Sequence, residues 1–145
     1  MDYPLAPQAA PTVFLAEDDP NDAWLLRRAL SRTAPGVVLR VTTDGRSAIE
    51  SLSRVAADVG QPGPRPPNVV LLDVHLPRAS GWEVLRWIKD QTPLRAVPVF
   101  VWTSLPTPEG VARAKELGAA RYFSKPEDPS GYLQLAATIG SLVGD

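Results

Sequence analysis

Five residues with chemically active side chains follow apolar runs in this 145-residue sequence. They bring three carboxylates, one hydroxyl and one ammonium group: Glu17, Asp18, Asp73, Thr103 and Lys125. Runs such as Val69–Leu72 are typical of strands buried on both faces of a parallel sheet. The carboxyl ends of such strands face the ligand crevice of an open α/β sheet. We therefore expect these five side chains to meet at one edge of a sheet.

The chemistry that this group suits is the formation of an aspartyl phosphate. Carboxylates packed as closely as Glu17, Asp18 and Asp73 repel one another unless a cation shares the site. The sequence has no cysteine and one histidine, and hard oxygen ligands favour Mg²⁺, with Mn²⁺ as the alternative, over zinc. With the metal, the Lys125 ammonium and the Thr103 hydroxyl around it, Asp73 is the expected nucleophile.

The segments between these residues alternate between strand and helix signals. We expect strands over residues 12–16, 37–41, 69–73, 97–102 and 119–123. We expect helices over residues 20–33, 44–59, 81–91, 106–117 and 128–143. This alternation predicts a flavodoxin-like, doubly wound α/β fold with a five-stranded parallel sheet of order 2-1-3-4-5. In that order the first and third strands flank the crevice, so their carboxylates lie next to each other.

The composition predicts a soluble, cytoplasmic domain. The net charge is −1 and the basic residues are scattered, so we expect no nucleic-acid partner. No apolar run reaches the roughly 18 residues of a membrane span, and the N-terminus has no secretory pattern. Residues 1–11 are rich in proline and lack a period, which predicts a flexible tail before one domain over residues 12–145.

In their order along the chain, these motifs resemble the receiver domains of two-component response regulators. The resemblance covers about residues 12–143 and rests on four motifs: Glu17-Asp18, Leu71-Leu72-Asp73 followed by Pro77 and Gly81, Thr103-Ser104, and Lys125-Pro126. It implies a protein that accepts a phosphoryl group from a sensor histidine kinase and then changes the surface that it offers to partners. Only 20 residues follow Lys125, so we expect no output domain.

The resemblance also implies roles for individual residues. Asp73 is the implied phosphoacceptor, Thr103 bonds the phosphoryl group and Lys125 pairs with it. The implied Mg²⁺ ligands are Asp18, Asp73, the backbone carbonyl of His75 and, through a water, Glu17. Tyr122 matches the switch aromatic that moves as Thr103 engages the phosphoryl group. The family usually has a cis peptide after its lysine, which here is Lys125-Pro126.

Three further features resemble the single-domain regulators that partner phytochrome-type histidine kinases. They are the Glu17-Asp18-Asp19-Pro20-Asn21-Asp22 start, the proline-rich segment 61–67, and Trp82-Glu83-Val84-Leu85 with Ile88-Lys89. Such regulators often carry asparagine where this chain has His75. The difference leaves a backbone ligand unaffected and leaves open any side-chain role in the rate of dephosphorylation.

The last predicted helix is apolar on more than one side. One face carries Tyr132, Leu135, Ala136, Ile139 and Val143, while Leu133 and Leu142 lie off it. A helix of this kind needs a second partner. From the resemblance we expect a homodimer through helix 106–117, strand 119–123 and helix 128–143. The predicted contact residues are Tyr132, Leu135, Ala136, Ile139 and Leu142; the plain alternative is a terminal helix that is merely apolar.

Two other functions fit parts of the pattern. A phosphohydrolase of the Asp-x-Asp type has a second acid two residues after its nucleophile, where this chain has His75. A constitutive docking module would no longer take a phosphoryl group, whereas the acids, Thr103 and Lys125 are all present. We therefore expect a switch that catalyses only its own phosphotransfer and dephosphorylation, and not a metabolic enzyme.

Overall fold

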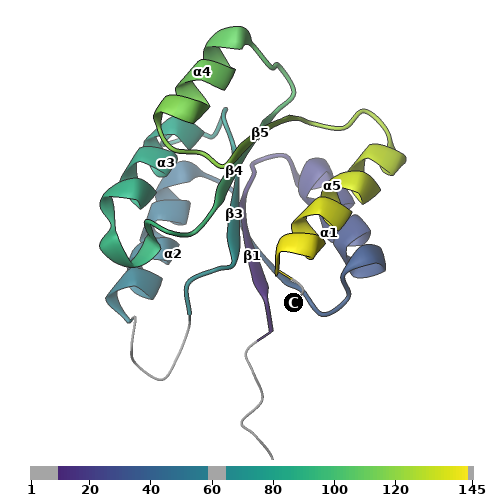
Figure 1. Cartoon of the computed structure of the whole chain (residues 1–145), viewed down its shortest axis with the longest axis horizontal. Helices are drawn as coiled ribbons and strands as arrows, with labels where there is room; N and C mark the ends of the chain where they lie inside the picture. The colour runs from purple at the N-terminus through teal and green to yellow at the C-terminus, as the bar shows by residue number, and fades with distance from the viewer. Residues whose placement is uncertain (1–9, 59–64, 144–145) are drawn as a thin grey trace, which may run out of the picture.

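Strands and helices alternate around one parallel sheet (Figure 1), in a computed structural model that describes residues 10–58 and 65–143. The strands are β1 (Thr12–Ala16), β2 (Val38–Thr42), β3 (Val69–Asp73), β4 (Val99–Thr103) and β5 (Arg121–Ser124). The helices are α1 (Pro20–Thr33), α2 (Gly45–Ala57), α3 (Gly81–Asp90), α4 (Pro108–Glu116) and α5 (Pro129–Val143), with a short 3-10 helix η1 (Thr92–Leu94). The strand order is β2-β1-β3-β4-β5, which confirms the predicted flavodoxin-like fold. Residues 1–9 of the predicted tail and Val59 of the second predicted helix lie outside the described residues.

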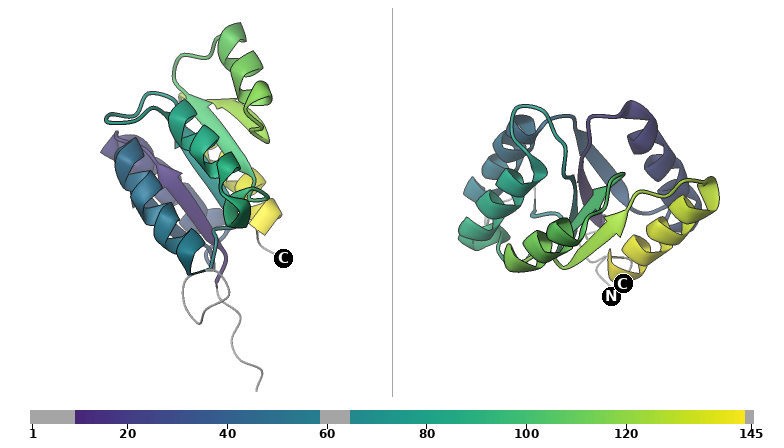
Figure 2. Two further views of the ribbon diagram at one scale, coloured as in Figure 1. Left: turned by 90° about the vertical axis from the view of Figure 1, so that its left-hand side faces the viewer. Right: turned by 90° about the horizontal axis from the view of Figure 1, so that it is seen from above.

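The sheet separates two hydrophobic cores, because successive side chains of a strand point to opposite faces. In β3, for example, Leu71 packs with α1 and α5, whereas Leu72 packs with α2 and α3. Figure 2, seen from above, shows α1 and α5 on one side of the sheet and α2, α3 and α4 on the other. Every residue of β3 and β4 is buried, as their continuous apolar runs predicted.

The parallel register brings the strand ends to one edge of the sheet. Ala16 of β1 lies opposite Leu72, and Asp73 lies opposite Trp102. Thr103 lies opposite Ser124. The residues that follow β1, β3, β4 and β5 therefore reach the same edge.

Capping side chains fix where the helices near that edge begin. The Asp19 carboxylate accepts a hydrogen bond from the Asn21 amide at 2.8 Å, and Pro20 follows the cap, as predicted. Ser80 and Glu83 form a reciprocal capping box at the start of α3. Each cap satisfies amide groups that a helix start leaves without a partner within the helix.

Two strands begin two residues later than predicted, and local chemistry explains both shifts. β4 begins at Val99 because Pro98 has no N–H to donate to the sheet, while the Val97 amide turns back to the carbonyl of Leu94 at 3.0 Å. β5 begins at Arg121 because the chain first closes the end of α4. The Ala119 amide donates to the carbonyl of Ala114 at 2.8 Å, around Gly118 with a φ of 88°.

The predicted partner face of the last helix is wrong for four of its five residues. Tyr132, Leu135, Ala136 and Ile139 are all buried against the sheet and α1. Only Leu142 is exposed, at 55%. The spacing showed which side of α5 is apolar, but the sheet covers that side, so these four residues belong to the core of a single chain.

Within the described ranges, α5 is the longest helix, and no helix combines the length and the hydropathy that a membrane span requires.

Candidate functional site

Three carboxylates form an acidic cluster, defined here as Glu17, Asp18 and Asp73. Their oxygen atoms lie within 4.8 Å of one another. Glu17 and Asp18 directly follow β1, and Asp73 ends the neighbouring β3. Glu17 and Asp73 are buried, whereas Asp18 is exposed. The cluster thus has a dry side and a side that water reaches, and its oxygens fit a hard divalent cation such as Mg²⁺.

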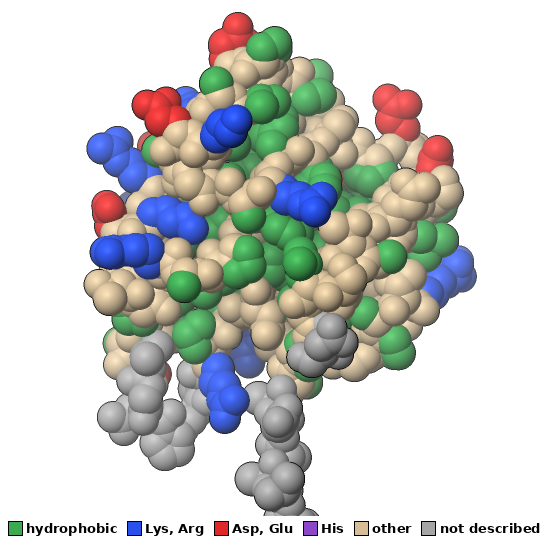
Figure 3. Space-filling view, viewed as in Figure 1, with side chains coloured by type: hydrophobic (Ala, Val, Ile, Leu, Met, Phe, Trp, Pro, Cys, Tyr) green, Lys and Arg blue, Asp and Glu red, His purple; other side chains and the backbone are tan. Residues whose placement is uncertain are grey.

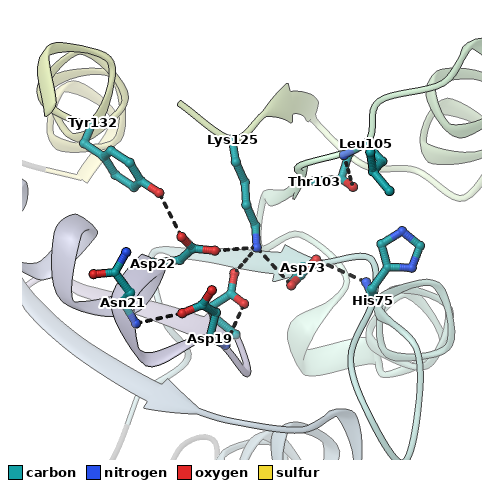
Figure 4. A network of polar contacts seen from close by, with 10 residues as sticks. Asp19, Asn21, Asp22, Asp73, His75, Thr103, Leu105, Lys125 and Tyr132 are labelled. Carbon is teal, nitrogen blue, oxygen red and sulfur yellow. Dashed lines mark hydrogen bonds and ion pairs between the residues drawn. The ribbon is translucent and has the colours of Figure 1, made fainter. Parts of the chain in front are cut away.

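The ammonium of Lys125 lies between three carboxylates. Its Nζ is 2.7 Å from Glu17 Oε1, 2.9 Å from Asp22 Oδ2 and 3.1 Å from Asp73 Oδ2. Figure 4 shows the side chain reaching from the end of β5 into this group. The Lys125 amide donates to the carbonyl of Thr103 at 2.8 Å, which fixes the backbone from which the side chain extends. Burial acts to lower the pKa of Lys125, but Glu17 and Asp22 outweigh it, so the pKa is raised and the ammonium stays charged.

At Glu17, by contrast, the effect of burial on the pKa outweighs the effect of Lys125. Burial raises its pKa to about 8, and the neighbouring charge of Asp73 adds to the rise, although Lys125 acts against both. One ammonium therefore does not offset the negative charge gathered here. A cluster in which a buried carboxyl keeps its proton is suited to bind a cation that replaces that proton.

Both oxygens of Asp73 have partners. Oδ1 accepts a hydrogen bond from the His75 amide at 3.1 Å, and Oδ2 accepts one from Lys125. The imidazole of His75 is exposed at the rim. Asp73 is therefore oriented by the chain itself, with water-accessible space on the side of Asp18 and His75.

Two glycines hold the loop between β3 and α3 against its neighbours. The Gly81 amide donates to the carbonyl of Val74 at 3.0 Å, and the Gly45 amide donates to the carbonyl of Pro77 at 3.1 Å. A Cβ at Gly81 would collide with the carbonyl of Asp73, and one at Gly45 would collide with the carbonyl of Ala79. Both positions need glycine because the backbone approaches so closely.

Thr103 and Tyr122 lie on the α4 side of Asp73. Thr103 is buried, and its hydroxyl accepts a hydrogen bond from the Leu105 amide at 3.2 Å. The hydroxyl of Tyr122 accepts one from the Thr107 amide at 3.4 Å, just before α4. A pocket beside the site is lined by both residues and by His75. The structure therefore brings together all the site residues predicted from strand ends.

Sequence reasoning missed Asp22 as a partner of Lys125 and Tyr132 as a partner of Asp22. Asp22 Oδ2 pairs with Lys125, and its Oδ1 accepts a hydrogen bond from the Tyr132 hydroxyl at 3.3 Å. An acid in the first turn of a helix is explained by the helix dipole alone, so nothing in the local sequence singled out Asp22. Tyr132 was predicted to lie on a partner face. Its ring instead packs edge-on against Trp102, with centroids 6.2 Å apart.

The cis peptide that the resemblance implied at Lys125-Pro126 is not found, since residues 10–58 and 65–143 contain only trans bonds. The trans isomer is favoured for a bond before proline by about 0.5–1 kcal/mol.

The fold and the residues at its edge match a known family. The family model of the response regulator receiver domain matches residues 13–137. The chain belongs to that family, whose members are signalling modules.

Known relatives and structures agree with this membership. The polar-differentiation response regulator DivK of Brucella ovis is 35% identical over 79 residues, which cover 54% of this chain and 62% of DivK. The phosphorylated cyanobacterial phytochrome response regulator RcpA superposes with a TM-score of 0.81 at 26% identity, covering 94% of this chain and 96% of RcpA. The Mn²⁺-bound response regulator Rcp1 gives a TM-score of 0.76 at 29% identity, covering 90% of this chain and 92% of Rcp1.

Proposed function

We propose that this receiver domain accepts a phosphoryl group on Asp73 from a sensor histidine kinase. The observation that carries the proposal is the pairing of Asp73 with the Lys125 ammonium inside the acidic cluster. An oxygen of Asp73 attacks the phosphorus of a phosphohistidine, so that an O–P bond forms as the P–N bond breaks. The bonding pair stays on the imidazole nitrogen of the kinase, which takes up a proton.

The acidic cluster is the proposed Mg²⁺ site, with Mn²⁺ as a substitute. Asp18, Asp73 and the backbone carbonyl of His75 are the proposed direct ligands, and Glu17 acts through a water. When bound, the metal offsets negative charge on the transferring group. The carboxylate donor set and the proton-retaining Glu17 support this assignment, as does the Mn²⁺-bound form of the similar regulator Rcp1.

Thr103 and Tyr122 are the proposed switch pair. When the Thr103 hydroxyl turns to a phosphoryl oxygen, it breaks its hydrogen bond with the Leu105 amide. The segment before α4 then loses one of the hydrogen bonds that hold it in place. The Tyr122 hydroxyl bonds the same segment at Thr107 and can follow it. A local charge event thus biases a two-state element, and the surface around α4 changes.

The proposed kinase is of the phytochrome type, and the protein acts in the cytoplasm. RcpA, a phytochrome response regulator, supports this pairing because it superposes over most of both chains. The phosphotransfer and the later loss of the phosphoryl group are the only reactions proposed for this chain.

Acetyl phosphate tests the proposal without the kinase. Incubation with acetyl phosphate and Mg²⁺ is expected to add the mass of one phosphoryl group, and hydroxylamine is expected to remove it. The adduct should be absent without divalent metal and in Asp73→Asn. An adduct retained in that variant would refute Asp73 as the acceptor, and steady hydrolysis of many phosphate esters would indicate a phosphohydrolase instead.

A homodimer through α4, β5 and α5 is the second part of the proposal. Figure 3 shows hydrophobic side chains running down the middle of this side of the molecule, between α4 and α5. Leu142 is the member of the predicted contact set that is exposed. Light scattering at micromolar concentration is the test, and a monomer both with and without phosphorylation would exclude the dimer.

A further inference from the structure

Lys125 is enclosed by acidic side chains before any phosphoryl group arrives. Its ammonium donates hydrogen bonds to Asp22 Oδ2 at 2.9 Å and to Asp73 Oδ2 at 3.1 Å, and Nζ also lies 2.7 Å from Glu17 Oε1. A phosphoryl group on Asp73 brings new anionic oxygens beside the same Nζ. If Nζ moves toward these oxygens, at least one of the contacts that now hold it must lengthen.

The exposure of the three partners shows which contact can be released. The side chain of Glu17 is 0% exposed, that of Asp73 is 6% exposed and carries the phosphoryl group, and that of Asp22 is 19% exposed. A carboxylate that loses its ammonium inside the protein keeps the full cost of desolvation, whereas one near the surface can be hydrated again. Asp22 is therefore the partner that Lys125 can leave at the lowest cost.

Asp22 also connects Lys125 to α5. Its other oxygen accepts a hydrogen bond from the Tyr132 hydroxyl, which lies in the first turn of α5 and is buried. Figure 4 shows Asp22 between Lys125 and Tyr132. Trp102 lies beside both partners, with its ring 5.1 Å from Lys125 Nζ and edge-on to Tyr132. A movement of the ammonium therefore changes groups on α1, β4 and α5 together.

We propose that Asp22 is a positioning residue that holds Lys125 in the resting site and releases it on phosphorylation, so that Tyr132 transmits the change to α5. The inference rests on the proposed phosphorylation of Asp73. It adds a second route out of the site, on the α1 and α5 side of the sheet, opposite the Thr103 and Tyr122 pair.

The proposal predicts that phosphorylation of Asp73 is faster when the contact between Asp22 and Lys125 is removed. Asp22→Asn keeps the shape of the side chain and an oxygen for Tyr132, but it weakens the resting contact that opposes movement of Lys125. At saturating Mg²⁺, phosphorylation by acetyl phosphate should be roughly threefold faster, the size expected for one partly exposed ion pair. Asp22→Glu, which restores the charge, should return the rate toward that of the wild type.

The control and the spectroscopic measurement separate this role from a general effect of charge. Glu127→Gln removes an exposed carboxylate from the same segment as Lys125 and should leave the rate unchanged. In NMR spectra, the Trp102 indole N–H of free Asp22→Asn should already lie toward its position in wild type bound to beryllofluoride and Mg²⁺. Tyr132→Phe should keep the wild-type rate within about twofold, as expected for one hydrogen bond distant from the reacting atoms, but lose the response of the α5 amides.

The outcomes distinguish the two proposals. If the wild type takes up no phosphoryl group, the proposed function fails. If the wild type is phosphorylated but Asp22→Asn reacts no faster than Glu127→Gln, the role of Asp22 is refuted and the function stands. An unaltered α5 response in Tyr132→Phe would refute the transmission through Tyr132.

Discussion

At the scale of single residues, the site is defined by an excess of carboxylates over cations. Lys125 contacts three of them, and Asp18 is a fourth nearby. The chain manages this excess in two ways: Lys125 keeps its charge, and burial makes Glu17 keep a proton. The raised pKa of Glu17 should make the stability of the protein depend on pH, and the proposed Mg²⁺ site should make it depend on divalent metal.

We predict that, without metal, the protein loses stability as the pH rises through the range set by Glu17. Its pKa is about 8 in the folded protein and 4.5 ordinarily, so between these values the folded state binds more protons than the unfolded state. The contribution of this group to the free energy of unfolding should therefore fall from about pH 4.5 to about pH 8 and then level off. Urea unfolding in the presence of EDTA, repeated across this pH range, measures the free energy of unfolding.

Glu17→Gln is the matched control, because it keeps the size of the side chain and cannot titrate. Its free energy of unfolding should lack the fall seen in the wild type. Added Mg²⁺ should stabilise the wild type more at about pH 8 than at about pH 5.5, since proton and metal compete for the same carboxylates. Equal slopes in the two proteins would contradict the raised pKa.

The residues at strand ends could be predicted because their positions follow from the strands. All strands of a parallel sheet run in the same direction, so Asp73, Thr103 and Lys125 reach the same edge of the sheet. Asp22 and Tyr132 lie on helices. Which of their side chains meet depends on how α1 and α5 pack together, and the local sequence does not determine that.

At the scale of elements, the loop between β3 and α3 depends on a close backbone approach. A Cβ at Gly81 would collide with the carbonyl of Asp73, whereas a Cβ at Gly36 would meet nothing within 4 Å. We predict that Gly81→Ala destabilises the fold by about 1–3 kcal/mol, as overpacking does. It should also slow phosphorylation, because the shift displaces Asp73.

Gly36→Ala is the control for the same substitution in open space. Its φ is not in the left-handed region, since Gly118 is the glycine with positive φ in the described ranges. Its stability should stay within about 1 kcal/mol of the wild type and its phosphorylation rate should not change. Urea unfolding and the acetyl phosphate assay measure both variants. A Gly81→Ala protein that behaves like Gly36→Ala would show that the loop tolerates the added carbon.

The helices illustrate what periodicity can and cannot predict. The existence of all five helices could be predicted from capping residues and apolar spacing, with ends that shifted by a few residues. The partner of α5 could not, because an apolar stripe looks the same whether a sheet or a second molecule covers it. The sheet covers Leu135 and Ile139, and the prediction of a partner face for them failed for that reason.

At the scale of the whole molecule, α5 closes the core on one side of the sheet. Ile139 is fully buried in that core, whereas Leu142 of the same helix is 55% exposed. We predict that Ile139→Ala lowers the free energy of unfolding by about 2–5 kcal/mol. At protein concentrations low enough to keep the chain monomeric, Leu142→Ala should change it by less than about 0.5 kcal/mol. Chemical denaturation of the monomer measures both, and similar losses would mean that another part of the same chain covers Leu142 in solution.

Because Lys125 contacts three carboxylates, the geometry of its charged group matters as well as the charge. The ammonium donates hydrogen bonds to carboxylates at the start of α1 and the end of β3, and it also lies 2.7 Å from a carboxylate oxygen at the end of β1. A guanidinium carries the same charge but is flat, and its parallel N–H groups suit a single carboxylate. Arginine at position 125 would therefore keep the charge and leave part of this convergence unpaired. The end of β1, the start of α1 and the end of β3 thus converge on the compact ammonium of one lysine.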